Sequence, residues 1–555
     1  MSLGGAIARR RGSGVSLQAP EWSAGAWAAI GVCAAFVLLT LWWLTQDRAV
    51  PYGDAAEELW AAFRFRDYLL HANVAAIFDY PAYYPPYGLV LGGAIAIVGG
   101  IDRGAVVLGA NLLCVPLLAL SCYRIGRRVA GSRAGALAVL FALGSPLLIE
   151  QLHVFIIDAP EAAIVALSVL LVLASERFER VGVAALAGLA VGIGVGTKEQ
   201  FPLYVTGLLV VVLLRGGWRN WRGLAAFAVV ALAVALPWYV AQSERLSLVW
   251  SAANSGRGLL FPVPPLARPP LLSAANAEWY GWATLNGLLF APLAAFALAG
   301  VASAVAGLRR ASVRAGVVPE LLGGLGGAWL LLTLLAHKDM RYTLPLIVYL
   351  AVLGTAWIAP LRPAARTIAT AGLAAAVLAT TLGMTFGVGG AIPDRLPGNL
   401  GAALGVGVPP RDTVVVYANH DYLVSGPRRD ADVLGLLRGL RRIGVRYVYW
   451  DPAATGPEHG EFNGAGISVL TRIAGLSVPT RIAFEVVLPH YALLMYEPAA
   501  PGSSPCLRFH DGMGVWALIG RGTRAVSYCP GRGILGSPIP VPQITVGQAG
   551  ATNLP

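Results

Sequence analysis

Long apolar runs separated by short polar segments dominate residues 22–387. The first run, 22–45, is almost free of charge and long enough to cross the ~30 Å hydrocarbon core of a bilayer. A further segment, 87–101, is apolar but short and glycine-rich, which favours a re-entrant or partly inserted element. After the first span we expect full spans at 104–123, 134–152, 160–175, 181–197, 201–214, 224–241, 286–307, 317–336, 343–359 and 367–387. The pattern predicts an all-α polytopic membrane protein with about 11–12 transmembrane helices.

Arginine clusters set the expected orientation of these spans. Arg9, Arg10 and Arg11 precede the first run, so the positive-inside rule places residues 1–21 in the cytoplasm. Five later clusters fall on that same side if every expected span crosses once: Arg124, Arg127, Arg128 and Arg133; Arg177 and Arg180; Arg215, Arg219 and Arg222; Arg309, Arg310 and Arg314; Arg362 and Arg366. We therefore expect a multi-pass protein of the plasma (inner) membrane, with the membrane domain at 22–387.

The pattern changes after residue 388. Segments 413–417 and 446–450 are typical of short strands, and 433–441 of a helix, which predicts an extracytoplasmic soluble α/β domain at 388–555. Cys506 and Cys529 lie in this polar region, where an oxidising compartment would allow a disulfide between them. The Pro-, Gly- and Ser-rich segment 242–285 is either a mobile loop over a site or a disordered linker.

The amino-acid composition limits the classes of function that this protein can have. The chain has 555 residues, 57% of them hydrophobic and 13% charged, which excludes a soluble globular enzyme and a disordered protein. The net charge of +12 comes from arginines between apolar runs, where they meet anionic membrane lipids, and no nucleic-acid motif is present. No Walker loop, HExxH or GxSxG motif supports ATP, zinc or serine chemistry.

Asp54 is the first candidate site residue, because it is an acid placed just outside the first span. Asp54-Ala55-Ala56-Glu57 also has the form of a helix capping box, so cap and catalyst are equally favoured by spacing. The segment that follows places Leu59, Trp60, Phe63 and Leu70 at helical spacing, which predicts an amphipathic helix in the outer interface.

Further candidates lie in two other outer segments. Asp158 and Glu161 are acids at a membrane edge, and Asp158 also has the alternative role of N-cap for a helix beginning at Pro160. Tyr84, Pro85 and Pro86 belong to a Tyr- and Pro-rich stretch that would form a rigid wall for a lipid-linked ligand, or an aromatic belt at the interface.

The two lysines are informative. Of 41 basic residues only Lys198 and Lys338 are lysine, and both fall at expected outer ends of helices. Ammonium groups suit phosphate binding, and Arg341 would add a bidentate fork. The alternative is that these lysines snorkel and pair with Glu199 and Asp339.

The order of these features resembles the GT-C class of membrane glycosyltransferases, in the branch of dolichyl-phosphate-mannose protein mannosyltransferases and bacterial lipid A aminoarabinose transferases. The matching elements are the first helix, the outer-loop acid, the interfacial helix, "YPPYG", the later acid, "GTKEQ" and "RYTLP". The resemblance implies a hexosyl- or pentosyltransferase with a polyprenyl-phosphate-linked donor and a glycan, lipid or protein as acceptor.

The resemblance also implies roles for residues. Asp54 would be the general base or would orient the acceptor hydroxyl, and Asp158 would position acceptor or sugar. The donor phosphate would meet Lys198, Lys338, Arg341 and Tyr342. Asp54 is followed by Ala55 where such families often have Glu, so the acidic pair is incomplete. No cofactor or metal ligand is assigned, and use of a divalent metal is left open.

Two rival functions stay in consideration. A transporter or flippase of a lipid-linked glycan would place charged groups along a path through the spans, whereas here polar residues gather at one face. A catalytically silent scaffold related to the GT-C class is the second, and the missing Glu after Asp54 keeps it open.

Overall fold

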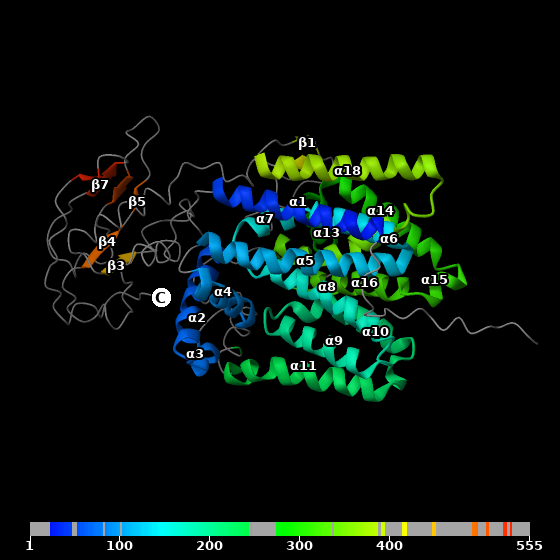
Figure 1. Ribbon diagram of the computed structural model, residues 1–555, viewed down its shortest axis with the longest axis horizontal. Helices are drawn as coiled ribbons and strands as arrows, with labels where there is room; N and C mark the ends of the chain where they lie inside the picture. Colours follow the sequence, from blue (N-terminus) through cyan, green and yellow to red (C-terminus); the bar gives the residue numbers. More distant parts are fainter. Residues whose placement is uncertain are drawn as a thin grey trace, which may run out of the picture.

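The computed structural model describes most of the membrane domain and short segments of the tail. The described residues are 23–46, 53–80, 84–99, 103–243, 246, 273–335, 338–386, 390–393, 413–418, 447–450, 491–494, 496–497, 507–509, 526–529 and 533–535. Over these ranges the membrane domain is helical, and the tail contributes strands (Figure 1).

The helices follow the expected spans closely. In chain order they are α1 (Ala24–Gln46), α2 (Gly53–Leu70), α3 (Val74–Asp79), α4 (Tyr87–Gly99), α5 (Arg103–Ala130), α6 (Ser132–Leu143), α7 (Pro146–His153), α8 (Asp158–Ala174), α9 (Val181–Val195), α10 (Phe201–Leu214), η1 (Gly217–Arg219), α11 (Trp221–Ala241), α13 (Ala274–Ala283), η2 (Thr284–Leu289), α14 (Phe290–Gly307), α15 (Ala311–Ala315), α16 (Val318–Leu334), η3 (Met340–Leu346), α17 (Ile347–Ala356) and α18 (Pro363–Phe386). Each expected span therefore coincides with a helix or with consecutive helices.

Length separates the helices into classes. By length and composition α1, α5, α11, α18 and the continuous segment Glu278–Gly307 can each cross a membrane, and the pair α6–α7, bent by 59°, would add a sixth span. The other apolar helices are shorter. Among them, α4 has 13 residues and is ~20 Å long at 1.5 Å per residue, less than the bilayer core, and the re-entrant course expected for it stays a prediction. The chain is a multi-pass membrane protein.

One expectation about the outer segments needs correction. The predicted loop 242–285 does not extend to its expected end, because residues from Ala274 onwards form α13 and the π-helix η2. Ser273 explains where the helix begins, since its side chain accepts a hydrogen bond from the backbone N–H of Asn276. The residues from 247 to 272 lie outside the described part of the chain.

The bundle has two chemically different ends. Helices α8, α9 and α10 run alternately between them, so the ends of α8 and α10 meet near Arg177 and Arg215. Both guanidinium groups bind the carboxylate of Glu320 in the first turn of α16, with Arg177 Nε 3.5 Å from Glu320 Oε1. At the opposite end α8 begins with Asp158 and α9 leads into Lys198, which places those two residues together.

Strands of the tail form three small sheets. β1 (Gly390–Pro393) pairs antiparallel with β2 (Thr413–Ala418), and β3 (Tyr447–Trp450) pairs parallel with β4 (Tyr491–Leu494). A four-stranded antiparallel sheet has the order β5 (Tyr496–Glu497), β6 (Leu507–Phe509), β7 (Val526–Cys529) and β8 (Gly533–Leu535). The strands expected at 413–417 and 446–450 are thus confirmed. The helix expected at 433–441 lies outside the described residues. Cys506 also lies outside them, so its expected disulfide with Cys529 stays a prediction. The domain boundary at 388 stays a prediction as well.

Candidate functional site

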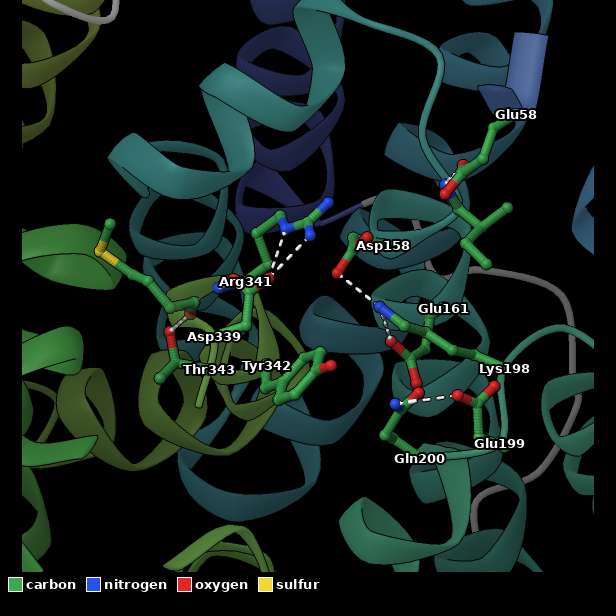
Figure 2. Close-up of polar contacts among 12 residues, drawn as sticks. Glu58, Asp158, Glu161, Lys198, Glu199, Gln200, Asp339, Arg341, Tyr342 and Thr343 are labelled. Carbon is green, nitrogen blue, oxygen red and sulfur yellow. Dashed lines mark hydrogen bonds and ion pairs between the residues drawn. The ribbon is translucent and has the colours of Figure 1, made fainter. Parts of the chain in front are cut away.

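Lys198 is the centre of a buried polar cluster at the end of the helix bundle opposite to Glu320. Its Nζ lies 2.8 Å from Asp158 Oδ1 and 3.7 Å from Glu161 Oε2, as Figure 2 shows. The same ammonium lies 5.3 Å from the ring centroid of Tyr84 and 5.2 Å from that of Tyr342. The four segments quoted above as "YPPYG", the later acid, "GTKEQ" and "RYTLP" therefore meet at one cation.

Local backbone geometry places Lys198 at this point. The backbone N–H of Lys198 donates to the carbonyl of Gly194 at 3.0 Å, so the turn after α9 continues to the lysine. The carbonyl of Gly196 accepts from the backbone N–H of Tyr87 at 2.9 Å, which joins this turn to the start of α4. A Cβ atom on Gly196 would lie 2.3 Å from the Tyr87 ring, so the close approach requires glycine.

Two carboxylates share this one ammonium in a site closed to solvent. Lys198 and Glu161 are 0% exposed and Asp158 is 1% exposed. Burial alone would lower the pKa of Lys198, but the charges of Asp158 and Glu161 raise it well above its usual value. Lys198 therefore stays protonated.

The cluster still has hydrogen-bonding capacity. Asp158 Oδ2 and Glu161 Oε1 are buried and have no hydrogen-bond partner among the described residues. Such oxygens accept hydrogen bonds from hydroxyl groups.

The predicted phosphate-binding residues take different positions. Lys198 is occupied by Asp158 and Glu161, and the alternative of a pair with Glu199 is not found, since Glu199 Oε1 instead accepts from Gln200 Nε2 at 3.1 Å. The structure thus gives Lys198 contacts with carboxylates inside the protein.

Arg341 and Tyr342 enter the site from η3. Arg341 donates to Asp339 Oδ2 from Nη2 at 2.7 Å and from Nε at 3.0 Å. Burial raises the pKa of Asp339, but the hydrogen bonds and charge of Arg341 outweigh burial and lower it below its ordinary value. The carbonyl of Tyr342 accepts from the hydroxyl of Tyr204 at 3.0 Å, which holds the Tyr342 ring against Lys198.

Lys338 lies apart from the Lys198 cluster, at the end of α16. Its Nζ donates to the carbonyls of Thr333 at 2.9 Å and Leu332 at 3.3 Å, and it lies 4.8 Å from the centroid of the Tyr280 ring. Cations are favoured at helix C-termini, so this position also has a structural explanation. Burial lowers the pKa of Lys338 to about 8.

Helix α2 approaches the same region. Asp54 is its second residue, in the first turn, and its side chain lies outside the described residues. One turn later the buried Glu58 accepts a hydrogen bond at 2.6 Å from the backbone N–H of Ile157, the residue before Asp158.

Two acids of this region were missed by sequence reasoning. Glu58 lies in a polar stretch beside the more conspicuous Asp54, and its contact with Ile157 joins segments 99 positions apart. Glu150 lies inside the apolar run expected at 134–152, where only its charge distinguished it. For Glu150 the available signal was an acid in an otherwise apolar segment.

The remaining predicted site features are placed as follows. Tyr84, Pro85 and Pro86 are all buried, and the ring of Tyr84 lies beside the Lys198 ammonium. Their role as a wall for a lipid-linked ligand stays a prediction. Within the described residues, no group of three or more His, Cys, Asp or Glu side chains is arranged to hold a metal ion. The Asp54 carboxylate is outside that comparison.

Comparisons with known proteins show which family and fold this chain resembles. Residues 84–240 match the family profile described as dolichyl-phosphate-mannose-protein mannosyltransferase. This segment includes "YPPYG", Asp158 and Lys198. A search of curated proteins found no match.

Solved structures give the fold. ArnT from Cupriavidus metallidurans in the apo state superposes with a TM-score of 0.55 at 17% identity, over 81% of this chain and 85% of ArnT. ArnT bound to undecaprenyl phosphate gives a TM-score of 0.55 at 16% identity, over 83% and 87% of the two chains. The oligosaccharyltransferase of Archaeoglobus fulgidus matches at a TM-score of 0.43 and 14% identity, over 80% and 64%. The chain resembles the GT-C class of membrane glycosyltransferases, as its motifs predicted, and it shares the fold of ArnT.

Proposed function

We propose that this protein is a glycosyltransferase that moves one sugar from a polyprenyl-phosphate-linked donor to an acceptor at the extracytoplasmic face of the inner membrane. The observation that carries the proposal is the convergence of Tyr84, Asp158, Glu161 and Tyr342 on the buried ammonium of Lys198. The matched family and the fold shared with ArnT, one structure of which contains undecaprenyl phosphate, support the same assignment.

The proposed reaction is a single displacement at the anomeric carbon. The acceptor hydroxyl attacks this carbon, the bond from the carbon to the phosphate oxygen breaks, and polyprenyl phosphate leaves with the electron pair. Asp54 takes the hydroxyl proton or orients the hydroxyl. Arg341 and Lys338 stabilise the negative charge that grows on the departing phosphate. No nucleotide is required, since the lipid carries the activated sugar.

The structure suggests a different task for Lys198 from the phosphate contact expected above. Its ammonium is already bound by two carboxylates in a closed site. We infer that Lys198 holds Asp158 in place, with one oxygen on the lysine and Oδ2 available to a substrate hydroxyl.

The rival functions make different predictions. A transporter would place charged groups along the spans, whereas the buried charges of α8 are Asp158 and Glu161 in its first turn. A catalytically silent scaffold would keep the cluster for stability alone, and only an activity measurement separates it from an enzyme.

The test is transfer of radiolabelled sugar from undecaprenyl-phosphate-linked mannose, glucose and arabinose in membranes that contain the protein. Wild type should transfer at least one sugar, and Asp54→Asn and Asp158→Asn should each reduce transfer by roughly 100-fold or more, the range of a lost general base. Glu179→Gln, at an exposed position beside the arginine clusters, is the matched control. Unchanged transfer in Asp54→Asn would return Asp54 to a capping role, and no transfer from any donor would favour the transporter or the scaffold.

A further inference from the structure

Glu150 is an acid without an assigned task in the half-helix α7. Its carboxylate makes no hydrogen bond or ion pair with any described residue, and the side chain is only partly exposed. A carboxylate inside an apolar, membrane-length segment is costly, and such residues usually serve a ligand or a pathway. Glu150 therefore requires an explanation that packing does not give.

The bend between α6 and α7 brings Glu150 to the site. The two helices meet at 59°, and the hydroxyl of Ser145 at the bend donates to the carbonyl of Leu288 at 2.7 Å while Pro146 begins α7. After this bend α7 packs against η3 and α8, the elements that carry Arg341 and Asp158. Glu150 accordingly lies on a helix that packs against the elements carrying Arg341 and Asp158.

The neighbours of Glu150 define what it would meet in the proposed reaction, on which this inference rests. In a polyprenyl-phosphate-linked sugar, the sugar ring is attached directly to the phosphate. If Arg341 binds the phosphate and Asp158 lies at the reacting sugar, a carboxylate on the helix packed against both elements lies beside the ring. We propose that Glu150 binds hydroxyl groups of the donor sugar and selects donors that present them.

The chemistry of a carboxylate fits this role. An ionised carboxylate is an acceptor only, with two oxygens that take two neighbouring hydroxyl groups of a sugar ring. Hydrogen bonds to a charged acceptor are roughly twice as strong as neutral ones. In Glu150→Gln the side chain keeps its shape but loses the charge and one acceptor oxygen.

The test is donor binding, which needs no knowledge of the acceptor. Purified full-length protein in lipid nanodiscs would be titrated with undecaprenyl-phosphate-linked mannose, glucose and arabinose, and separately with undecaprenyl phosphate that carries no sugar. We expect Glu150→Gln to weaken binding of the preferred sugar-bearing donor by roughly tenfold or more, and to change binding of undecaprenyl phosphate by less than about twofold. Arg341→Lys should weaken both, and Glu179→Gln neither.

Donors that lack one hydroxyl provide a second readout. For wild type, removing the hydroxyl that Glu150 binds should cost about as much affinity as Glu150→Gln does, and in the variant the same removal should have little further effect. A merely structural role of Glu150 would not produce this coupling. Thermal unfolding and gel-filtration profiles of Glu150→Gln check that the variant is folded.

The outcomes separate this inference from the proposed function. Equal affinity of wild type and Glu150→Gln for the sugar-bearing donor would overturn the role of Glu150 and leave the function intact. An equal loss of affinity for the sugar-bearing donor and for undecaprenyl phosphate would also overturn it, because the side chain would then act through the phosphate site or the fold. Failure of wild type to bind any of the four lipids would remove the proposed function itself.

Discussion

The ammonium of Lys198 lies 2.8 Å from Oδ1 of Asp158, and each side chain is 1% exposed. The two residues are 40 positions apart: Asp158 opens α8, and Lys198 follows α9. A buried ion pair stabilises little by itself, because desolvation offsets most of the attraction. The consequence of this pair is a fixed orientation of the Asp158 carboxylate, because the lysine holds one oxygen and leaves the other for a ligand.

Removal of Lys198 should therefore be destabilising. Lys198→Met would leave Asp158 and Glu161 buried without a counter-charge, at a cost of about 3–5 kcal/mol. Thermal unfolding in detergent micelles would measure the change. Lys198→Met with Asp158→Asn buries one carboxyl group fewer without the ammonium, so the double variant should be more stable than Lys198→Met. A double variant as unstable as the sum of its single changes would contradict the direct pairing.

Gly196 offers a prediction about the wall of the site. In Gly196→Ala the added Cβ would fall 2.3 Å from the ring of Tyr87, so this ring and the preceding Tyr84–Pro86 segment must shift. Overpacking of this kind costs about 1–3 kcal/mol, and the shift should also lower sugar transfer.

Gly182 is the matched control for this change. It lies in the first turn of α9, the helix that Gly196 follows, and a Cβ there has nothing within 4 Å. Gly182→Ala should leave transfer unchanged and stabilise the helix slightly, by up to about 1 kcal/mol. Equal effects of the two substitutions on transfer would show that contact with Tyr87 is not the cause.

Much of the fold could be predicted because membrane helices have a distinctive composition of long apolar runs. Apolar runs and arginine clusters gave the helices and their alternation, and the short run at 87–101 gave α4. The helix α13 was not predicted, because the segment before it is rich in Pro and Gly and suggested a loop. The start of the helix depends on a single capping residue, Ser273.

The sequence allowed several residues of the site to be predicted, but not the contacts between them. Lys198 and Asp158 stood out as charges in an apolar chain, but their sequences could not show that they bind each other across two helices. Tertiary packing makes that pair and leaves Lys338 on the end of α16. Glu150 escaped notice because the sequence does not show that α7 packs against η3, the element that carries Arg341.

Glu320 allows the arginine-rich end to be tested separately from the site. Its buried carboxylate binds Arg177 and Arg215, and Arg215 also donates to the carbonyl of Gly316 at 2.7 Å. Glu320→Ala should lower stability by roughly 2 kcal/mol, less than a fully buried pair would, because both arginines are partly exposed. Donor affinity measured in folded protein should be unchanged. A loss of affinity would show that the two ends of the bundle are coupled.

The pKa of Lys338 predicts a pH dependence of donor binding. Burial lowers this pKa to about 8, so the side chain is mostly charged at pH 7 and mostly neutral at pH 9.5. If Lys338 binds the donor phosphate, affinity for undecaprenyl phosphate should fall as pH rises through about 8. Lys338→Gln should bind more weakly at pH 7 and show no such step. A step of equal size in both proteins would assign the titration to another group.

Stability should change in the opposite direction over the same pH range. The pKa of Lys338 is lower in the folded protein than the ~10.4 of an unfolded chain, so the unfolded state binds more protons between these two values. The free energy of unfolding of wild type should therefore rise with pH from about 8 to about 10.4 relative to Lys338→Gln, while phosphate affinity falls. A role limited to capping α16 would give the stability change without the affinity change, so measuring both in one pair of proteins distinguishes a phosphate ligand from a helix cap.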